Sequence, residues 1–182
     1  MYFMQFQTKQ DKTVSLLFFT LDQTAALSNY WGKLSVTTKQ RFAPHAFDEA
    51  SILELFKEPS QHIGFTATEA GTNNIIAYSV IQIGCIQHDA ERIKAYGLKL
   101  SNITDASFAP SVADAWQSSG LGSAMFLFIK SSLRQFGIKR LFLWGGVQAG
   151  NEKAVQFYLK HNFSKLGLFE YNGSNWDMFS DL

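Results

Sequence analysis

Hydrophobic positions along this chain fall into short unbroken runs and into longer stretches with helical spacing. The short runs are rich in β-branched and aromatic residues, and they predict strands over 14–19, 63–68, 75–83, 106–112 and 141–144. Near the C-terminus, 163–171 and 176–179 predict a hairpin that turns at Asn172-Gly173.

Helical spacing predicts four helices. Asp22 is a candidate N-cap for the first, over 23–31, and Phe47 or Asp48 opens the second, which ends before Pro59. The third spans 120–136, and Asn151 starts the fourth, which runs to about residue 161. The third has the clearest apolar stripe, formed by Leu121, Met125, Phe128, Ile129, Leu133 and Phe136. The polar segment 85–104 predicts a lid or an edge element.

This succession of elements predicts a mixed α/β (α+β) fold. There is no internal repeat and no linker composition, so residues 1–182 are expected to form a single domain.

Composition narrows the functional classes. Sixteen basic and fifteen acidic residues give a net charge of +1, without the basic face that a nucleic-acid partner requires. No apolar run approaches the roughly 20 residues that cross a bilayer, and the N-terminus does not resemble a signal peptide. The lone Cys85 fits a reducing compartment. We therefore expect a cytoplasmic protein with neither a nucleic-acid nor a membrane partner.

The segment Gln117-Ser-Ser-Gly-Leu-Gly122 lies between a predicted strand and the start of a predicted helix. Backbone N–H groups at a helix start lack partners and lie at the positive end of the helix dipole, so such a turn suits a phosphate or pyrophosphate. The segment lacks both the Lys-Ser/Thr pair of a P-loop and the spacing of a dinucleotide fold. Taken alone, its glycines can also be ordinary turn residues.

Two motifs carry a family resemblance. Residues 112–122 match Val-x-x-x-x-(Arg/Gln)-x-x-Gly-x-(Gly/Ala), and 151–158 match Asn-x-x-Ala-x-x-(Phe/Leu)-Tyr. Asn162-Phe163 followed by Gly167 is similar to the usual ending of the second motif, with Asn replacing a glycine. In this order and spacing the motifs resemble those of the GNAT acetyltransferase superfamily. The segment 37–48 resembles an acceptor-side segment of some members.

The resemblance implies the GNAT fold, a mixed and mostly antiparallel sheet flanked by helices, in which a splayed parallel strand pair binds CoA. It implies acetyl-CoA as cosubstrate and no metal. The glycines Gly145-Gly146 are compatible with the splay, although an ordinary loop explains them as well. The implied cofactor-binding residues are Val112, Gln117, Ser118, Ser119, Gly120, Leu121, Gly122, Ser123 and Asn151.

The resemblance also implies N-acetyl transfer, by direct attack of an amine on the thioester in a ternary complex. Tyr158 is the implied general acid for the CoA thiolate, although a tyrosine on a helix commonly has a packing role instead. The alternative is a catalytically silent GNAT-fold module that binds CoA as a sensor or partner. Transfer of a longer acyl group also stays open.

The general base and the acceptor are not assigned by the sequence. Asp105 lies where many family members have a glutamate, but it can simply be a polar residue at a strand start; Glu69, His45 and His88 are further candidates. The expected acceptor is a small-molecule amine or a peptide amine. An aromatic acceptor pocket and ordinary core packing both explain Phe42, His45, Phe47, Tyr78 and Tyr96. The C-terminal hairpin can also pair across a homodimer.

Overall fold

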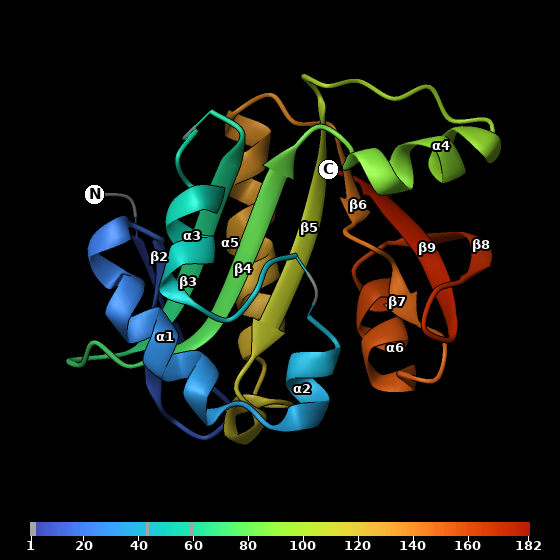
Figure 1. Ribbon diagram of the computed structural model, residues 1–182. Coiled ribbons are helices and arrows are strands. Elements are labelled where there is room, and N and C mark those ends of the chain that lie inside the picture. Colours follow the sequence, from blue (N-terminus) through green and yellow to red (C-terminus); the bar gives the residue numbers. More distant parts are fainter. Residues whose placement is uncertain (1–2, 43, 59) are drawn as a thin grey trace. The chain divides into compact units, whose positions relative to one another are not determined.

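The computed structural model describes residues 3–42, 44–58 and 60–182 (Figure 1). The chain divides into two compact units. The first contains residues 1–81 and 110–131, and the second contains 82–109 and 132–182. The division cuts through three elements, so β4, β5 and α5 each contribute residues to both units.

The first unit is built on an ordered set of strands. In space they follow the order β1, β2, β3, β4 and β5, and β1–β2 and β2–β3 pair antiparallel. Their bounds are β1 Phe3–Gln7, β2 Thr13–Phe18, β3 His62–Glu69, β4 Ile75–Ile83 and β5 Asp105–Val112. β4 is buried along most of its length, which matches its continuous apolar run.

Helices cover both faces of these strands, with α1 and α3 on one side and α5 on the other (Figure 1). Two adjacent residues, Phe18 and Phe19, show how the chain supplies an apolar surface to both layers of helices. The Phe19 ring packs 5.0 Å from that of Phe56 just after α3, whereas the Phe18 ring packs 6.0 Å from that of Phe128 on α5. Successive side chains of an extended chain point to opposite faces, so each layer receives its own apolar surface. The helices are η1 Leu21–Gln23, α1 Thr24–Lys33, α2 Val36–Gln40, α3 Glu49–Leu55 and α5 Leu121–Gln135.

In the second unit the order is β5, β6 and β9, and both β7 and β8 also pair with β9. β5 and β6 are parallel, in register from Asp105–Arg140 to Phe108–Leu143, and β6 is antiparallel to β9. β6 ends at Leu143 while β5 continues to Val112. The bounds are α4 Gln87–Ala95, β6 Arg140–Leu143, β7 Val147–Gln148, α6 Glu152–Lys160, β8 Ser164–Glu170 and β9 Ser174–Asp181.

The expected fold class is confirmed: a mixed, mostly antiparallel arrangement with one parallel pair, flanked by helices. Two local predictions were wrong. Asp22 is not an N-cap, because it lies inside η1, where the Gln23 side chain accepts from the Thr20 N–H at 3.2 Å. Phe136 follows the end of α5 and is 55% exposed, so it does not belong to the apolar stripe of that helix. The polar segment after residue 85, expected as a lid or an edge element, contains a regular helix, α4. The pattern also missed β1, α2 and β7, which are all short.

Candidate functional site

The turn between β5 and α5 has the geometry of an anion site. A short 3₁₀ helix, η2 (Asp114–Trp116), follows β5, and α5 begins at Leu121. Ser118 and Gly120 have positive φ angles of 64° and 91°. Left-handed residues that alternate with right-handed ones turn successive N–H groups toward a common concave side. The turn predicted from the glycines is therefore present.

Most amides of this turn are available to a ligand. Within residues 3–42, 44–58 and 60–182, no backbone or side-chain atom accepts from the N–H groups of Ser118, Ser119, Gly120 or Gly122. The Ser119 side chain holds the turn, since its hydroxyl donates to the Trp116 carbonyl at 2.6 Å and accepts from the Leu121 N–H at 3.3 Å. These four amides, at the positive end of a 15-residue helix, suit a pyrophosphate.

The residues at the two ends of the turn are also linked. The Gln117 side-chain amide donates to the Val112 carbonyl at 3.3 Å. Asp114 is fixed by residues at the start of α2, since its carboxylate accepts from the Ser35 N–H at 3.0 Å and from the Thr38 hydroxyl at 2.7 Å. These hydrogen bonds, led by that from the Ser35 N–H, lower the pKa of Asp114. Val112 and Gln117 therefore form part of one braced turn.

The β1–β2 hairpin supplies basic residues to this turn. The Lys9 N–H donates to the Ser119 carbonyl at 3.1 Å, and its Cγ lies 3.9 Å from where a Cβ on Gly120 would stand. The Lys12 ammonium lies 4.7 Å from the centroid of the Trp116 ring. Both lysines are exposed, so their charge can add to the helix dipole at an anion site. Sequence patterns could not reveal them, because they precede the turn by more than 100 residues.

The second motif forms the start and the core face of α6, in the second unit. The Asn151 side chain caps the helix, accepting from the Ala154 N–H at 3.4 Å. Tyr158 is buried, with ring centroids of Phe157 and Phe163 at 5.3 and 5.2 Å. Burial raises the pKa of the Tyr158 phenol, so it keeps its proton at neutral pH. No described residue hydrogen-bonds to this hydroxyl, which is compatible with both the acid and the packing hypotheses.

Asp105, the carboxylate nearest to the expected base position, has a structural role. It is fully buried at the start of β5 and forms a two-point pair with Arg140, at 2.8 and 2.7 Å. The Ser101 N–H donates to the same carboxylate at 2.7 Å. A carboxylate engaged in this way is poorly placed to take a proton, so the structure favours the strand-start interpretation. Arg140 is likewise committed to this pair.

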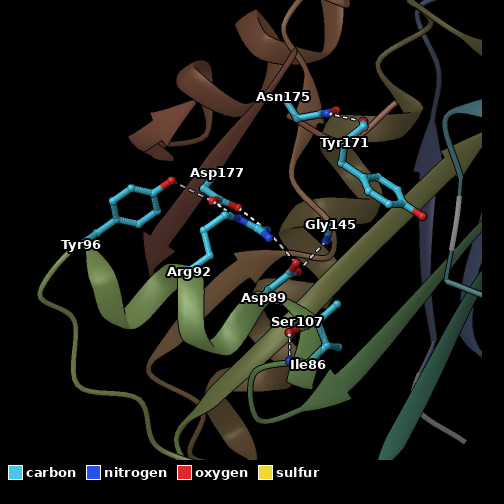
Figure 2. Close-up of polar contacts among 9 residues, drawn as sticks. All are labelled: Ile86, Asp89, Arg92, Tyr96, Ser107, Gly145, Tyr171, Asn175 and Asp177. Carbon is cyan, nitrogen blue, oxygen red and sulfur yellow. Dashed lines mark hydrogen bonds and ion pairs between the residues drawn. The ribbon is translucent and has the colours of Figure 1, made fainter. Parts of the chain in front are cut away.

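A buried ion network explains the polar segment 85–104 (Figure 2). Arg92 on α4 lies between Asp89 and Asp177, with nitrogen–oxygen distances of 2.6 and 2.5 Å, and both carboxylates are almost fully buried. Asp89 also accepts from the Gly145 N–H at 2.7 Å, and the Tyr96 hydroxyl donates to Asp177 at 3.1 Å. Gly145 has a φ of 70°, which suits a glycine. The network therefore gives Gly145 and Tyr96 structural roles.

The other aromatic residues proposed for an acceptor pocket do come together. Rings of Phe42, His45, Phe47 and Tyr78 contact one another in the first unit, and Trp31 of α1 completes the group. The remaining base candidates lie elsewhere: Glu69 ends β3, and His88 is exposed on α4.

Known proteins share both the motif region and the fold. Residues 109–163 match the acetyltransferase (GNAT) family. The GNAT domain of PAT from S. lividans matches with a TM-score of 0.78 and 21% identity, over 99% of this chain and 97% of that one. YncA of Salmonella typhimurium, a putative acetyltransferase solved with acetyl-CoA, matches with a TM-score of 0.66 and 15% identity, over 93% of this chain and 92% of that one. Ard1 from Thermoplasma volcanium matches with a TM-score of 0.64 and 18% identity, over 93% of this chain and 97% of that one. No curated protein matches the sequence as a relative.

The family match covers the turn, α5, β6 and α6, and the solved structures share the fold over nearly the whole chain. The segment 109–163 thus resembles the GNAT acetyltransferase family, and the whole chain shares its fold with the solved structures. Among the described residues no helix is both long and apolar enough for a membrane span. The same residues contain no group of three or more His, Cys, Asp or Glu side chains arranged to hold a metal ion.

Proposed function

We propose that this protein is an acetyl-CoA-dependent N-acetyltransferase that acts on a primary amine. The observation that carries the proposal is the turn at Ser118–Gly122, where four amides at a helix N-terminus have no acceptor among the described residues. The residues present fit the pyrophosphate of CoA: Gly120 supplies the left-handed backbone, and Lys9 and Lys12 supply positive charge.

The chain contributes binding and proton transfer, and acetyl-CoA supplies the activated acetyl thioester. The amides of residues 117–123 hold the pyrophosphate, and Asn151 at the start of α6 binds a polar part of the cofactor. A backbone N–H near Val112 donates to the oxyanion that forms when a neutral amine attacks the carbonyl. Tyr158 then protonates the departing sulfur. Most of the acceleration comes from orientation and amide donors, because a ternary complex makes the attack effectively unimolecular.

Asp105 is paired with Arg140 and is therefore poorly placed to act as a general base. This gives some support to the alternative, a catalytically silent CoA-binding module. Such a module would bind acetyl-CoA at the same turn without releasing thiol. Binding and turnover must therefore be measured separately.

The test is a calorimetric titration with acetyl-CoA, followed by a thiol-release assay with a panel of primary amines. Gly120→Asp puts a carboxylate into the turn and should abolish micromolar binding, which corresponds to about −8 kcal/mol. Gly71→Asp is the matched control, because Gly71 also has a positive φ, of 76°, and an added Cβ there meets no atom within 4 Å. Equal binding by the wild type and Gly120→Asp would contradict the assigned site. Binding without thiol release from any amine would favour the silent module.

A further inference from the structure

Five aromatic side chains form a cluster in the first unit. We call the side chains of Trp31, Phe42, His45, Phe47 and Tyr78 the aromatic cluster. The His45 ring is central, with its centroid 5.1 Å from Trp31, 5.2 Å from Phe42 and 5.7 Å from Tyr78. Phe47 contacts Trp31 at 5.7 Å. The cluster joins α1, β4 and the segment between α2 and α3.

Three buried polar atoms in this cluster have no hydrogen-bond partner within residues 3–42, 44–58 and 60–182: Trp31 Nε1, His45 Nε2 and Tyr78 Oη. The Trp31 and Tyr78 residues are only 1% and 0% exposed. Burying such an atom without a hydrogen bond is unfavourable, and native proteins do so rarely. Phenylalanine would fill the same space without this penalty. Three such atoms among five contacting rings therefore indicate that the polar groups have a ligand.

The local hydrogen bonds define what that ligand must offer. His45 Nδ1 lies 2.8 Å from the Ala46 carbonyl, which can only accept, so Nδ1 carries the proton and the neutral ring presents a lone pair on Nε2. The indole of Trp31 can only donate, and the Tyr78 hydroxyl can do either. The complementary ligand has an N–H for His45 and an oxygen for Trp31.

The charged groups near the cluster further restrict the chemical class of the ligand. Aromatic faces attract cations, and the Asp48 carboxylate lies near enough to His45 to influence its charge. Among the described residues no lysine or arginine stacks on any of the five rings. An ammonium group is therefore favoured, whereas a carboxylate would be buried without a cation. The oxygen is accordingly that of an amide, a carbonyl or a hydroxyl.

The cluster lies beside the strand that leads to the CoA turn. The Tyr78 carbonyl accepts from the Ser111 hydroxyl at 3.3 Å, and the Ser111 hydroxyl is also bonded to the Tyr30 hydroxyl at 2.9 Å. One residue beyond β5, the Ala113 N–H donates to the Ile76 carbonyl of β4 at 2.9 Å. β4, which carries Tyr78, is thus joined to the last residues before η2.

We propose that the aromatic cluster binds the acceptor, an amine whose oxygen is uncharged, and that His45 Nε2 takes the proton of its ammonium group. This inference rests on the proposed acetyl transfer. The amine nitrogen gives one proton to His45 and forms a bond to the acetyl carbon. As the carbon–sulfur bond breaks, Tyr158 gives its proton to the sulfur, and the second proton of the amine nitrogen passes through solvent to the Tyr158 phenolate. The products are the amide and CoA thiol, and His45 returns its proton to solvent.

Binding is tested without turnover by following the Trp31 indole N–H in a ¹⁵N-correlated NMR spectrum. Its signal is assigned by its loss in Trp31→Phe. The probes are glycinamide and phenylalaninamide, each compared with its parent amino acid, with and without CoA. The signal should shift with an amide and should shift at least tenfold more weakly with the acid. No shift with either amide, or a stronger response to the acids, would overturn the proposal.

Turnover is tested with variants that remove single polar atoms. Tyr78→Phe and Trp31→Phe should each lower kcat/KM for the amides at least tenfold, and Tyr78→Phe should raise the melting temperature of the free protein. Tyr171→Phe, at an exposed position, is the matched control. Unchanged kinetics in both variants would show that the cluster only packs. An NMR shift without any turnover in the wild type would retain this amine site and refute acetyl transfer.

The pH profile tests the role of His45. Burial lowers the pKa of His45, against the opposing effects of the Ala46 carbonyl and Asp48; His62 and Tyr78 are the other titratable groups that face the ring. Since the neutral ring is needed, kcat/KM should fall with decreasing pH, with an inflexion below the ordinary histidine value of about 6.5. His45→Gln keeps an acceptor but cannot titrate, so it should bind the amides and lose this inflexion. An unchanged inflexion would exclude His45 as the base.

Discussion

At residue scale, Tyr158 shows how burial sets the chemistry of one side chain. Its phenol is enclosed by Phe157 and Phe163, and the consequent rise in its pKa keeps it protonated. A raised pKa also makes it a weaker acid. It is therefore expected to release its proton only as negative charge develops on a nearby sulfur atom.

Tyr158→Phe removes the proton of the phenol. It breaks no hydrogen bond, because the Tyr158 hydroxyl forms none with a described residue. We expect kcat to fall by about 10² to 10⁴, the usual contribution of general acid catalysis, with the affinity for acetyl-CoA unchanged. Single-turnover thiol release together with calorimetry measures the two quantities. Retention of full turnover would leave Tyr158 with a packing role alone.

At element scale, α4 is held by ion pairs more than by its apolar surface. Ile93 is a buried apolar residue of this helix, while Arg92 joins it to β9 through Asp177 and Asp89 joins it to the Gly145 turn (Figure 2). The guanidinium also lies 3.6 Å from the Phe169 ring centroid. An exposed ion pair contributes little, but removing the cation from two buried carboxylates is strongly destabilising.

Arg92→Met should therefore lower the free energy of unfolding by about 3 kcal/mol, measured by urea denaturation. Arg134→Met, at an exposed position near the end of α5, is the matched control and should change it by less than about 0.5 kcal/mol. Similar stabilities for the two variants would mean that the network does not hold α4.

At the scale of the whole molecule, segments distant in sequence build the Ser118–Gly122 turn, which we propose binds CoA. The hairpin that carries Lys9 contacts Ser119 through a backbone hydrogen bond. The positive charge at the turn therefore comes from a different part of the chain than its amides do. A ligand that binds only the folded state stabilises the protein by mass action, so melting experiments can report this arrangement.

Acetyl-CoA at about 100 times its Kd should stabilise the protein by about 2.7 kcal/mol and raise Tm by roughly 5 to 10 °C. Lys9→Ala should weaken binding about tenfold and remove about 1.4 kcal/mol of this stabilisation. Lys57→Ala, which removes an exposed lysine paired with Glu54 at 3.6 Å, should leave the shift intact. Equal shifts in Lys9→Ala and the wild type would show that the hairpin does not contact the cofactor.

Features that depend on neighbouring residues could be predicted from the sequence. The apolar runs and helical spacing identified most elements, and the Gly120 turn before α5 was found because its amides and its left-handed φ are local properties. The helix start at Asn151 was predicted in the same way, and the structure shows that its side chain caps α6. Short elements such as β7, which has two residues, carry too few positions for a periodic pattern to be visible.

Only the tertiary structure decided how polar side chains are paired, because a charge or a hydroxyl does not reveal its partner in sequence. From the sequence, Asp105 could be either a base or a polar residue at a strand start, and only folding showed that Arg140, 35 residues later, pairs with its carboxylate. Tyr96 is no longer a candidate for the acceptor pocket, because its hydroxyl donates to Asp177. Conversely, an acceptor pocket and core packing explained Tyr78 equally well, and folding brought its ring into contact with those of His45 and Trp31, whose buried ring nitrogens also have no partner among the described residues. The sequence by itself thus determined most of the elements and the turn before α5, and packing determined which buried polar groups have no partner among the described residues.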